Sequence, residues 1–399
     1  MRRGVLLLVL LAWACGEEEA DGPDAAVVDA SIEMDAADDA PDAEVDDEVD
    51  AEVDEGPDAA PITPGVGYYE ERIFYETPNG MGSRRLPVYW WYPAIPEGPP
   101  ALYLGSIART DVHTNAPPLI EGQAPVLVFS HGSGGFAQQS WWLTEGFAAA
   151  GFVVVSIDHI NNTFNDMSGG SEMFELRPAD IRAVIDHLAT LPPEHPLAGH
   201  VEVSRVALAG HSFGGYTTLA LSGAAYDLAA AEAVCAEGNN DVCDVLESSR
   251  ERFAAGLRDE RVAVAVPMTP GGYALFQNGL ADISIPTLLV TAALDQTLPD
   301  AEEGTPIWEG LAGADDMRVQ FTNAGHFSFI SVCNLLGQFG VDDGCGPQFT
   351  PTDRVGQITL DYALAFVRLH LLGDDSGRTL LDGPSPDPEV EISRKAGAP

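Results

Sequence analysis

The sequence predicts an α/β fold: a mostly parallel, doubly wound sheet with antiparallel strands at its N-terminal edge. Continuous apolar, β-branched runs alternate with segments of helical periodicity, as in a parallel sheet that helices cover on both faces. One run ends at the tight turn Gly210-His211-Ser212-Phe213-Gly214, which leads directly into a helix of small residues. Two alternating, aromatic-rich segments precede the first apolar run, and these predict the antiparallel edge.

Residues 1–15 are typical of an export signal. Met1-Arg2-Arg3 precedes an apolar stretch at 4–12 that is too short to span a membrane. The stretch ends at Ala12-Trp13-Ala14-Cys15, which resembles the lipobox of bacterial lipoproteins, whose cysteine is lipidated and begins the mature chain. Ala12 stands where that motif usually has Leu, so an ordinary cleaved signal is the alternative. We expect an exported protein of the cell envelope, attached to the membrane only through a lipid on Cys15.

Residues 16–61 are predicted to form an acidic, disordered linker. Residues 16–60 contain 20 of the 62 acidic residues and no Lys, Arg or aromatic residue, so like charges repel and no core can form. A calcium-binding repeat would need Asp at alternate positions ahead of a glycine, and that register is absent. Of the net charge of −43, the residues after this tract still carry a large negative share, and their acidity argues against a nucleic-acid partner or a polyanionic substrate.

Residues 62–372 are predicted to form a single catalytic domain, because 45% of the 399 residues are hydrophobic and the elements alternate without a break. The expected elements, in order, are strands at 68–75 and 85–92, a strand at 124–130, a helix at 138–150, a strand at 152–157, a helix at 180–191, the strand and helix at 206–221, an acidic helical insertion at 223–261, strands at 262–267, 286–291 and 318–321, and a helix at 353–372. Residues 373–399 are polar and are expected to form a C-terminal tail.

Four cysteines lie within the predicted domain, and an even number in an exported chain suggests disulfides. Three pairings are possible, and the short spacings favour Cys235–Cys243 and Cys333–Cys345. Four free thiols are the alternative. The spacings contain no C-x-x-C, so they predict no zinc site.

The turn at 210–214 has the pattern G-x-S-x-G, which places Ser212 at its centre as a candidate nucleophile. Such a turn strains the backbone and lifts the hydroxyl above the end of a sheet, and the glycines leave room for strand, helix and substrate. The pattern alone is common, and a serine that merely begins a helix is the alternative. The apolar strand before it and the helix formers after it strengthen the catalytic interpretation.

A serine hydroxyl is a poor nucleophile at neutral pH, so it needs a base, and that base needs an acid to orient it. Asp295 follows the strand at 286–291, and His326 follows the next strand. The order Ser212, Asp295, His326 is the chain order of α/β-hydrolases. The rival acids are Asp300 and Asp282, and the rival bases are His131, His159 and His211.

A tetrahedral intermediate needs two or more hydrogen-bond donors aimed at its oxyanion. One expected donor is the backbone N–H of Phe213, directly after the candidate nucleophile. The second is expected from the loop His131-Gly132-Ser133-Gly134-Gly135, where glycines permit close approach of the backbone. A plain glycine-rich turn is the alternative. A phosphate-binding loop is not favoured, since neither G-K-[ST] nor G-x-G-x-x-G occurs there.

Four stretches resemble the platelet-activating-factor acetylhydrolase and dienelactone hydrolase-like group: LPVYWWYP at 86–93, FSHGSGG at 129–135, GHSFGG at 210–215 and GHF at 325–327. PTLLVTAALDQTLP at 286–299 and GHF also resemble bacterial cutinase-like polyester hydrolases.

The resemblance covers about residues 66–372 and implies the α/β-hydrolase fold. It also implies a triad of Ser212, Asp295 and His326, with Ser133 donating an oxyanion N–H. Dienelactone hydrolases use a cysteine where this chain has Ser212. The polyester hydrolases have an aromatic clamp where this chain has residues 268–272, Met-Thr-Pro-Gly-Gly, so the sequence does not support polymer binding.

The sequence therefore predicts a serine hydrolase that cleaves carboxylic esters, of small molecules or lipids, through an acyl-enzyme and without a metal or organic cofactor. An amidase or peptidase on the same triad is one alternative. A non-catalytic surface binding protein on a hydrolase scaffold is another. The insertion at 223–261 could cover the site and narrow its substrates.

Overall fold

The computed structural model describes residues 63–77, 80, 82–338 and 340–395. The predicted signal peptide at 1–15, Cys15 and the predicted linker at 16–61 lie outside these residues. Among the described residues, no helix is both long enough and apolar enough to cross a bilayer.

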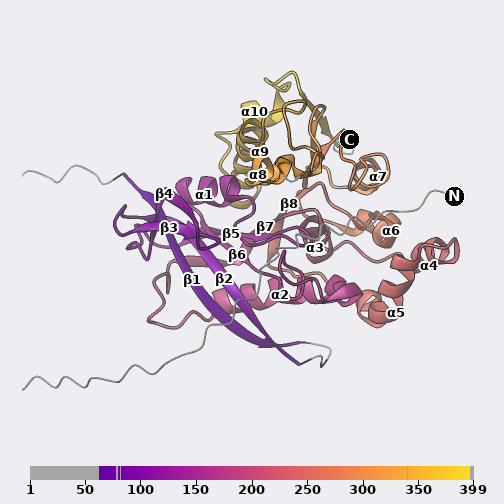
Figure 1. Ribbon diagram of the computed structural model, residues 1–399, viewed down its shortest axis with the longest axis horizontal. Helices are drawn as coiled ribbons and strands as arrows, with labels where there is room; N and C mark the ends of the chain where they lie inside the picture. The colour runs from indigo at the N-terminus through magenta and orange to yellow at the C-terminus, as the bar shows by residue number, and fades with distance from the viewer. Residues whose placement is uncertain (1–62, 78–79, 81, 339, 396–399) are drawn as a thin grey trace, which may run out of the picture. The chain divides into compact units, whose positions relative to one another are not determined.

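A single sheet organises the described residues, and Figure 1 labels its strands from β1 to β8. The full strand order is β11-β10-β9-β8-β7-β5-β6-β2-β1-β4-β3. Its centre, from β10 to β6, is parallel throughout, while β2 and β11 join the two ends of this centre in antiparallel pairing. The strands are β1 Gly65–Glu76, β2 Ser83–Ala94, β3 Pro100–Tyr103, β4 Ile107–Thr114, β5 Ala124–Ser130, β6 Val153–Ile157, β7 Val201–His211, β8 Val262–Met268, β9 Leu288–Ala292, β10 Met317–Phe321 and β11 Val390–Arg394.

Helices cover both faces of the sheet, so α9 and α2 lie on opposite sides of it (Figure 1). Successive residues of β5 alternate between the two cores: Leu127 packs in the cluster with α1 and α9, and Val128 packs in the cluster with α2. The helices are α1 Trp141–Ala149, α2 Met173–Leu188, α3 Phe213–Ser222, α4 Leu228–Ala236, α5 Asn240–Ala255, α6 Tyr273–Phe276, α7 Gly304–Gly310, α8 Cys333–Gly337, α9 Thr352–Val367 and α10 Arg378–Asp382. The predicted α/β architecture is confirmed.

The insertion at 223–261 contains α4 and α5, which pack with α3 and α6 in a third apolar cluster. The disulfide Cys235–Cys243 joins these two helices, and Cys333–Cys345 closes a loop after β10. Both favoured disulfide pairings are confirmed. The helix predicted at 353–372 ends earlier than expected, since α9 gives way to a wider π-helical turn at Arg368–Leu372.

The two ends of the sheet differ from the sequence prediction. The short strands β3 and β4 extend the antiparallel edge, and β4 pairs with β1 in parallel. Residues 373–395 are not a polar tail, because they contain α10 and the edge strand β11. Val390 packs in the core beside β10 and Ile392 packs partly against it, so only two apolar residues mark this strand and its signal is too short to see in the sequence.

Candidate active site

Ser212 lies in a strained turn between β7 and α3. Its φ of 59° and ψ of −118° are outside the ordinary regions for an L-residue. The flanking glycines are required by contact: a Cβ at Gly210 would lie 2.2 Å from the carbonyl oxygen of Gly214, and one at Gly214 would lie 1.9 Å from that of Ser130. The N–H of Ser212 donates to the Met268 carbonyl at 2.9 Å, which fastens the turn to β8.

The three predicted residues meet in one hydrogen-bonded chain at the carboxyl ends of β7, β9 and β10. His326 Nε2 lies 2.9 Å from Ser212 Oγ, and His326 Nδ1 lies 2.7 Å from Asp295 Oδ2. The other carboxylate oxygen of Asp295 accepts the N–H of Leu298 at 2.7 Å. A carboxylate only accepts, so Nδ1 of the neutral ring carries the proton and Nε2 presents its lone pair to the serine hydroxyl.

The glycine-rich loop after β5 lies against the nucleophile turn. A Cβ at Gly132 would lie 3.3 Å from the Cβ of Ser212, so the backbone of this loop comes close to the hydroxyl. Within the described part of the chain, the N–H groups of Ser133 and Phe213 donate to no backbone or side-chain acceptor. Two donors near Ser212 are thus available to a ligand oxygen.

A buried arginine contacts both segments of this predicted oxyanion site, the loop that carries Ser133 and the side chain of Phe213. Arg177 of α2 donates to the carbonyl oxygen of His131 and to Asn162 Oδ1, and Asn162 in turn donates to Ser133 Oγ at 3.2 Å. The guanidinium also lies over the ring of Phe213, 4.7 Å from its centroid. Burial lowers the pKa of Arg177 to about 9, so the group is still a cation at neutral pH.

A second chain of serine, histidine and aspartate lies beneath the loop. Ser130 Oγ is 2.9 Å from His159 Nε2, and His159 Nδ1 is 2.9 Å from Asp180 Oδ2. All three residues are 0% exposed, whereas Ser212 is 9% exposed. Burial, together with the nearby Arg177, lowers the pKa of His159 well below its usual value. No substrate can reach Ser130, so this set is structural.

The rival acids have other positions. Asp300 accepts from Arg318 at 2.6 and 2.8 Å, from Thr305 at 2.7 Å and from Gln320 at 3.0 Å, so it holds β10 to α7. Asp282 is exposed at the end of a short 3₁₀ segment ahead of β9. Neither of them contacts the histidine.

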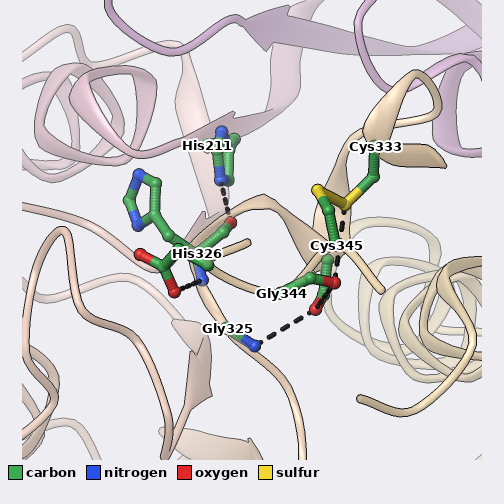
Figure 2. Close-up of a disulfide and its surroundings, with 8 residues drawn as sticks. His211, Gly325, His326, Cys333, Gly344 and Cys345 are labelled. Atoms are coloured by element: carbon green, nitrogen blue, oxygen red, sulfur yellow. Dashed lines mark hydrogen bonds between the residues drawn. A yellow bond between two sulfur atoms is a disulfide. The ribbon is translucent and has the colours of Figure 1, made fainter. Parts of the chain in front are cut away.

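The rival histidines have structural partners. His131 accepts the N–H of His159 at its Nε2. His211, inside the turn, lies with its Nε2 at 2.9 Å from the His326 carbonyl oxygen (Figure 2). Its Nδ1 lies 3.1 Å from Gln139 Nε2. His211 therefore donates to the backbone of His326 and accepts from Gln139.

We expect the acid stability of the protein to depend on His211. Burial and the neighbouring His326 lower the pKa of His211 to about 3, against about 6.5 in an unfolded chain. Between these values the unfolded state binds one more proton, so the free energy of unfolding falls as the pH falls. When the pH is lowered from 7.5 to 5.5, the free energy of unfolding of wild type should fall by about 1.4 kcal/mol more than that of His211→Asn, as measured by urea denaturation. Equal losses in both proteins would contradict this.

Some residues of the site carry no pattern in the sequence. Arg177 lies in a helix with no feature that separates it from a surface arginine. Asp343 lies between the cysteines of the second disulfide, and its carboxylate accepts the N–H of His326 at 3.0 Å. The sequence marks Asp343 only by its position: it lies in the loop that the predicted disulfide closes, shortly after the GHF motif at 325–327.

Comparisons with known proteins agree with this fold. Residues 100–166 match the family model of platelet-activating factor acetylhydrolase, isoform II. A cutinase of Thermobifida alba is 26% identical over 216 residues, which is 54% of this chain and 57% of that protein. A bis(hydroxyethyl) terephthalate hydrolase of Streptomyces coelicolor is 25% identical over 209 residues, 52% of each chain. The chain thus spans just over half the length of these two relatives.

A solved structure, a ferulic acid esterase from Streptomyces cinnamoneus, superposes with a TM-score of 0.60 at 24% identity. The superposition covers 85% of this chain and 98% of that one. The strand order, the Ser212 turn and these similarities together show that the chain has the α/β-hydrolase fold and is similar to the cutinase-like group.

Proposed function

We propose that the protein is a serine hydrolase that cleaves carboxylic esters through an acyl-enzyme intermediate. The observation that carries this proposal is the hydrogen-bonded chain from Ser212 Oγ through His326 to Asp295. A serine that merely begins a helix would not need a strained turn, nor a buried imidazole and a buried carboxylate hydrogen-bonded to it in sequence. The similarity to cutinases and to an esterase fold supports the same chemistry.

In the proposed reaction, Ser212 Oγ attacks the acyl carbon while His326 Nε2 takes its proton. Asp295 holds the imidazole in the required tautomer and stabilises the imidazolium that forms. The Ser133 and Phe213 N–H groups donate to the oxyanion. His326 then gives the proton to the leaving alcohol, and water repeats the two steps on the acyl-enzyme to release the acid. The reaction needs no electron transfer and no metal.

The substrate class is a carboxylic ester of small or medium size. This class is supported by the similarity to a cutinase and to a bis(hydroxyethyl) terephthalate hydrolase. Residues 268–272 of this chain contain no aromatic side chain that could form the clamp of the polyester hydrolases. Esters with short acyl chains are therefore the first substrates to test, with long-chain esters as the comparison.

A fluorophosphonate probe tests the proposal, because it phosphonylates only a serine that a base activates. Wild type should be labelled, and peptide mass spectrometry should place the label on Ser212. Ser130→Ala is the matched control, since Ser130 also bonds to a histidine that bonds to an aspartate but is not exposed, and this variant should still be labelled. A wild-type protein that takes up no label, or takes it up at another serine, would exclude the proposed mechanism.

Two disulfides are typical of a protein that folds outside the reducing cytosol. This supports export. Lipidation of Cys15, and attachment to the cell envelope through that lipid, stays a prediction from the sequence.

A further inference from the structure

Asp343 connects the two loops that carry Asp295 and His326. We propose that Asp343 is a positioning residue for the triad, which sets the distance between acid and base without touching the substrate. The inference rests on the proposed function, because it assigns Asp343 a role in the same reaction.

The carboxylate of Asp343 accepts hydrogen bonds from both loops. Oδ1 accepts the N–H of His326 at 3.0 Å. Oδ2 accepts the N–H of Thr297 at 2.8 Å and the Thr297 hydroxyl at 2.7 Å. The N–H of Gln296, the residue after Asp295, lies 3.2 Å from Oδ1 and 3.1 Å from Oδ2. Oδ1 thus accepts from the histidine loop and shares the Gln296 N–H with Oδ2, which otherwise accepts from Thr297 of the aspartate loop.

The backbone around Asp343 is attached to the histidine loop as well. The Asp343 carbonyl oxygen accepts the N–H of Phe327 at 2.9 Å. Ser328 Oγ accepts the N–H of Gly325 at 3.1 Å and donates to the Gly344 carbonyl at 3.0 Å. Figure 2 shows Gly344 beside the disulfide and the backbone of Gly325 and His326 next to this segment, with the His326 ring directed away from the disulfide. These bonds fix the position of Asp343 relative to His326 on both sides.

The fit around Asp343 leaves no room for an adjustment. Asp343 is 7% exposed, and a Cβ at Gly325 would lie 2.5 Å from its Oδ1. Gly344, the next residue, has a φ of 93°, which favours glycine, and the disulfide Cys333–Cys345 closes the loop one residue later. The loop therefore presents the carboxylate in one position.

Asparagine at this position separates positioning from packing, because it has the same shape as aspartate. An amide offers one acceptor oxygen and one NH₂ group, and the NH₂ group would face donors from whichever loop it points to. One of the two loops must therefore shift. A displacement of about 1 Å within a catalytic site can lower the rate by about 100-fold.

The matched control is Asp316, a buried carboxylate that connects the same two strands at their opposite ends. It accepts the N–H of Thr287 at 3.1 Å, ahead of β9, and that of Gly313 at 2.7 Å, ahead of β10. Asp316→Asn should therefore lower the stability in a similar way while it leaves the distance between Asp295 and His326 unchanged.

The experiment uses the full chain and makes two measurements. Hydrolysis of a nitrophenyl ester gives kcat and KM, and reaction with the fluorophosphonate probe gives the labelling rate. We expect Asp343→Asn to lower kcat and the labelling rate by about 10-fold to 100-fold while KM changes by less than about twofold. Asp316→Asn should retain wild-type kcat even where its Tm falls. A wild-type kcat in Asp343→Asn, or an equal loss of kcat in Asp316→Asn, overturns this inference and leaves the proposed function standing.

A second variant covers the case in which Asp343→Asn does not fold. Thr297→Val removes one hydrogen bond to Oδ2 and keeps the carboxylate and the side-chain shape. It should lower kcat by about threefold to tenfold at unchanged KM. A wild-type kcat in Thr297→Val overturns the inference in that case. A wild-type protein with neither ester hydrolysis nor labelling is a different outcome, since it overturns the proposed function and this inference together.

Discussion

Alanine at position 212 is expected to lower kcat for a short-chain nitrophenyl ester by about 10⁶-fold. Ser212 Oγ is the atom that would form the bond to the acyl carbon, and it is the hydroxyl that lies beside His326 Nε2 in the described part of the chain. Serine hydrolases lose about this factor when the nucleophile is removed, and a small residual rate remains from the oxyanion donors. Release of nitrophenol, followed at saturating substrate, measures the effect.

The control for Ser212→Ala is again Ser130→Ala, which removes a serine from the buried chain with His159. Its kcat should stay far above that of Ser212→Ala, because Ser130 has no access to substrate. A Ser212→Ala protein that keeps more than about 1% of wild-type kcat is incompatible with attack by Ser212.

Asparagine at position 295 is expected to lower kcat by about 10⁴-fold with little change in the structure. Asp295 Oδ1 accepts the N–H of Leu298, so the amide oxygen of an asparagine takes that place and its NH₂ group faces His326 Nδ1. The NH₂ group donates, which moves the imidazole proton to Nε2. His326 then presents a hydrogen to Ser212 and can no longer accept its proton.

Asp300→Asn is the control for this tautomer effect. Asp300 lies five residues further along the same loop, but its partners are Arg318, Thr305 and Gln320, and none of them is in the triad. This variant should lose stability and keep its kcat. A normal kcat in Asp295→Asn would assign the orienting role to another group, and a fall in Asp300→Asn equal to that in Asp295→Asn would show that loop packing, not tautomer control, sets the rate.

The sequence predicted the central sheet because each buried strand is a continuous apolar run. It also predicted the three residues that meet in the candidate site, because α/β-hydrolases place nucleophile, acid and base after successive strands. Ser212, Asp295 and His326 are visible in this way, each directly after a run of apolar residues. The two disulfides follow from their short spacings, and both are present.

The remaining features have no local signal. β4 is mostly polar because it lies near the edge of the sheet, so IARTDVHT resembles a loop. Asp343 and Arg177 are charged residues whose burial depends on contacts with residues 15 or more positions away, such as Asn162 and His326. A prediction from periodicity detects which face is apolar. It cannot detect a polar group that is buried because distant donors surround it.

A serine, a histidine and an aspartate are hydrogen-bonded in line at nearly the same interatomic distances in two places, once at Ser212 and once at Ser130. A template made of these side-chain atoms alone would therefore match this molecule at two places. The backbone separates them, since Ser212 occupies a strained turn with a positive φ that leaves it partly exposed, while Ser130 ends a covered strand. When related genomes are annotated, the backbone conformation of a serine is thus a more selective marker of a hydrolase than the side chains that are hydrogen-bonded to its hydroxyl.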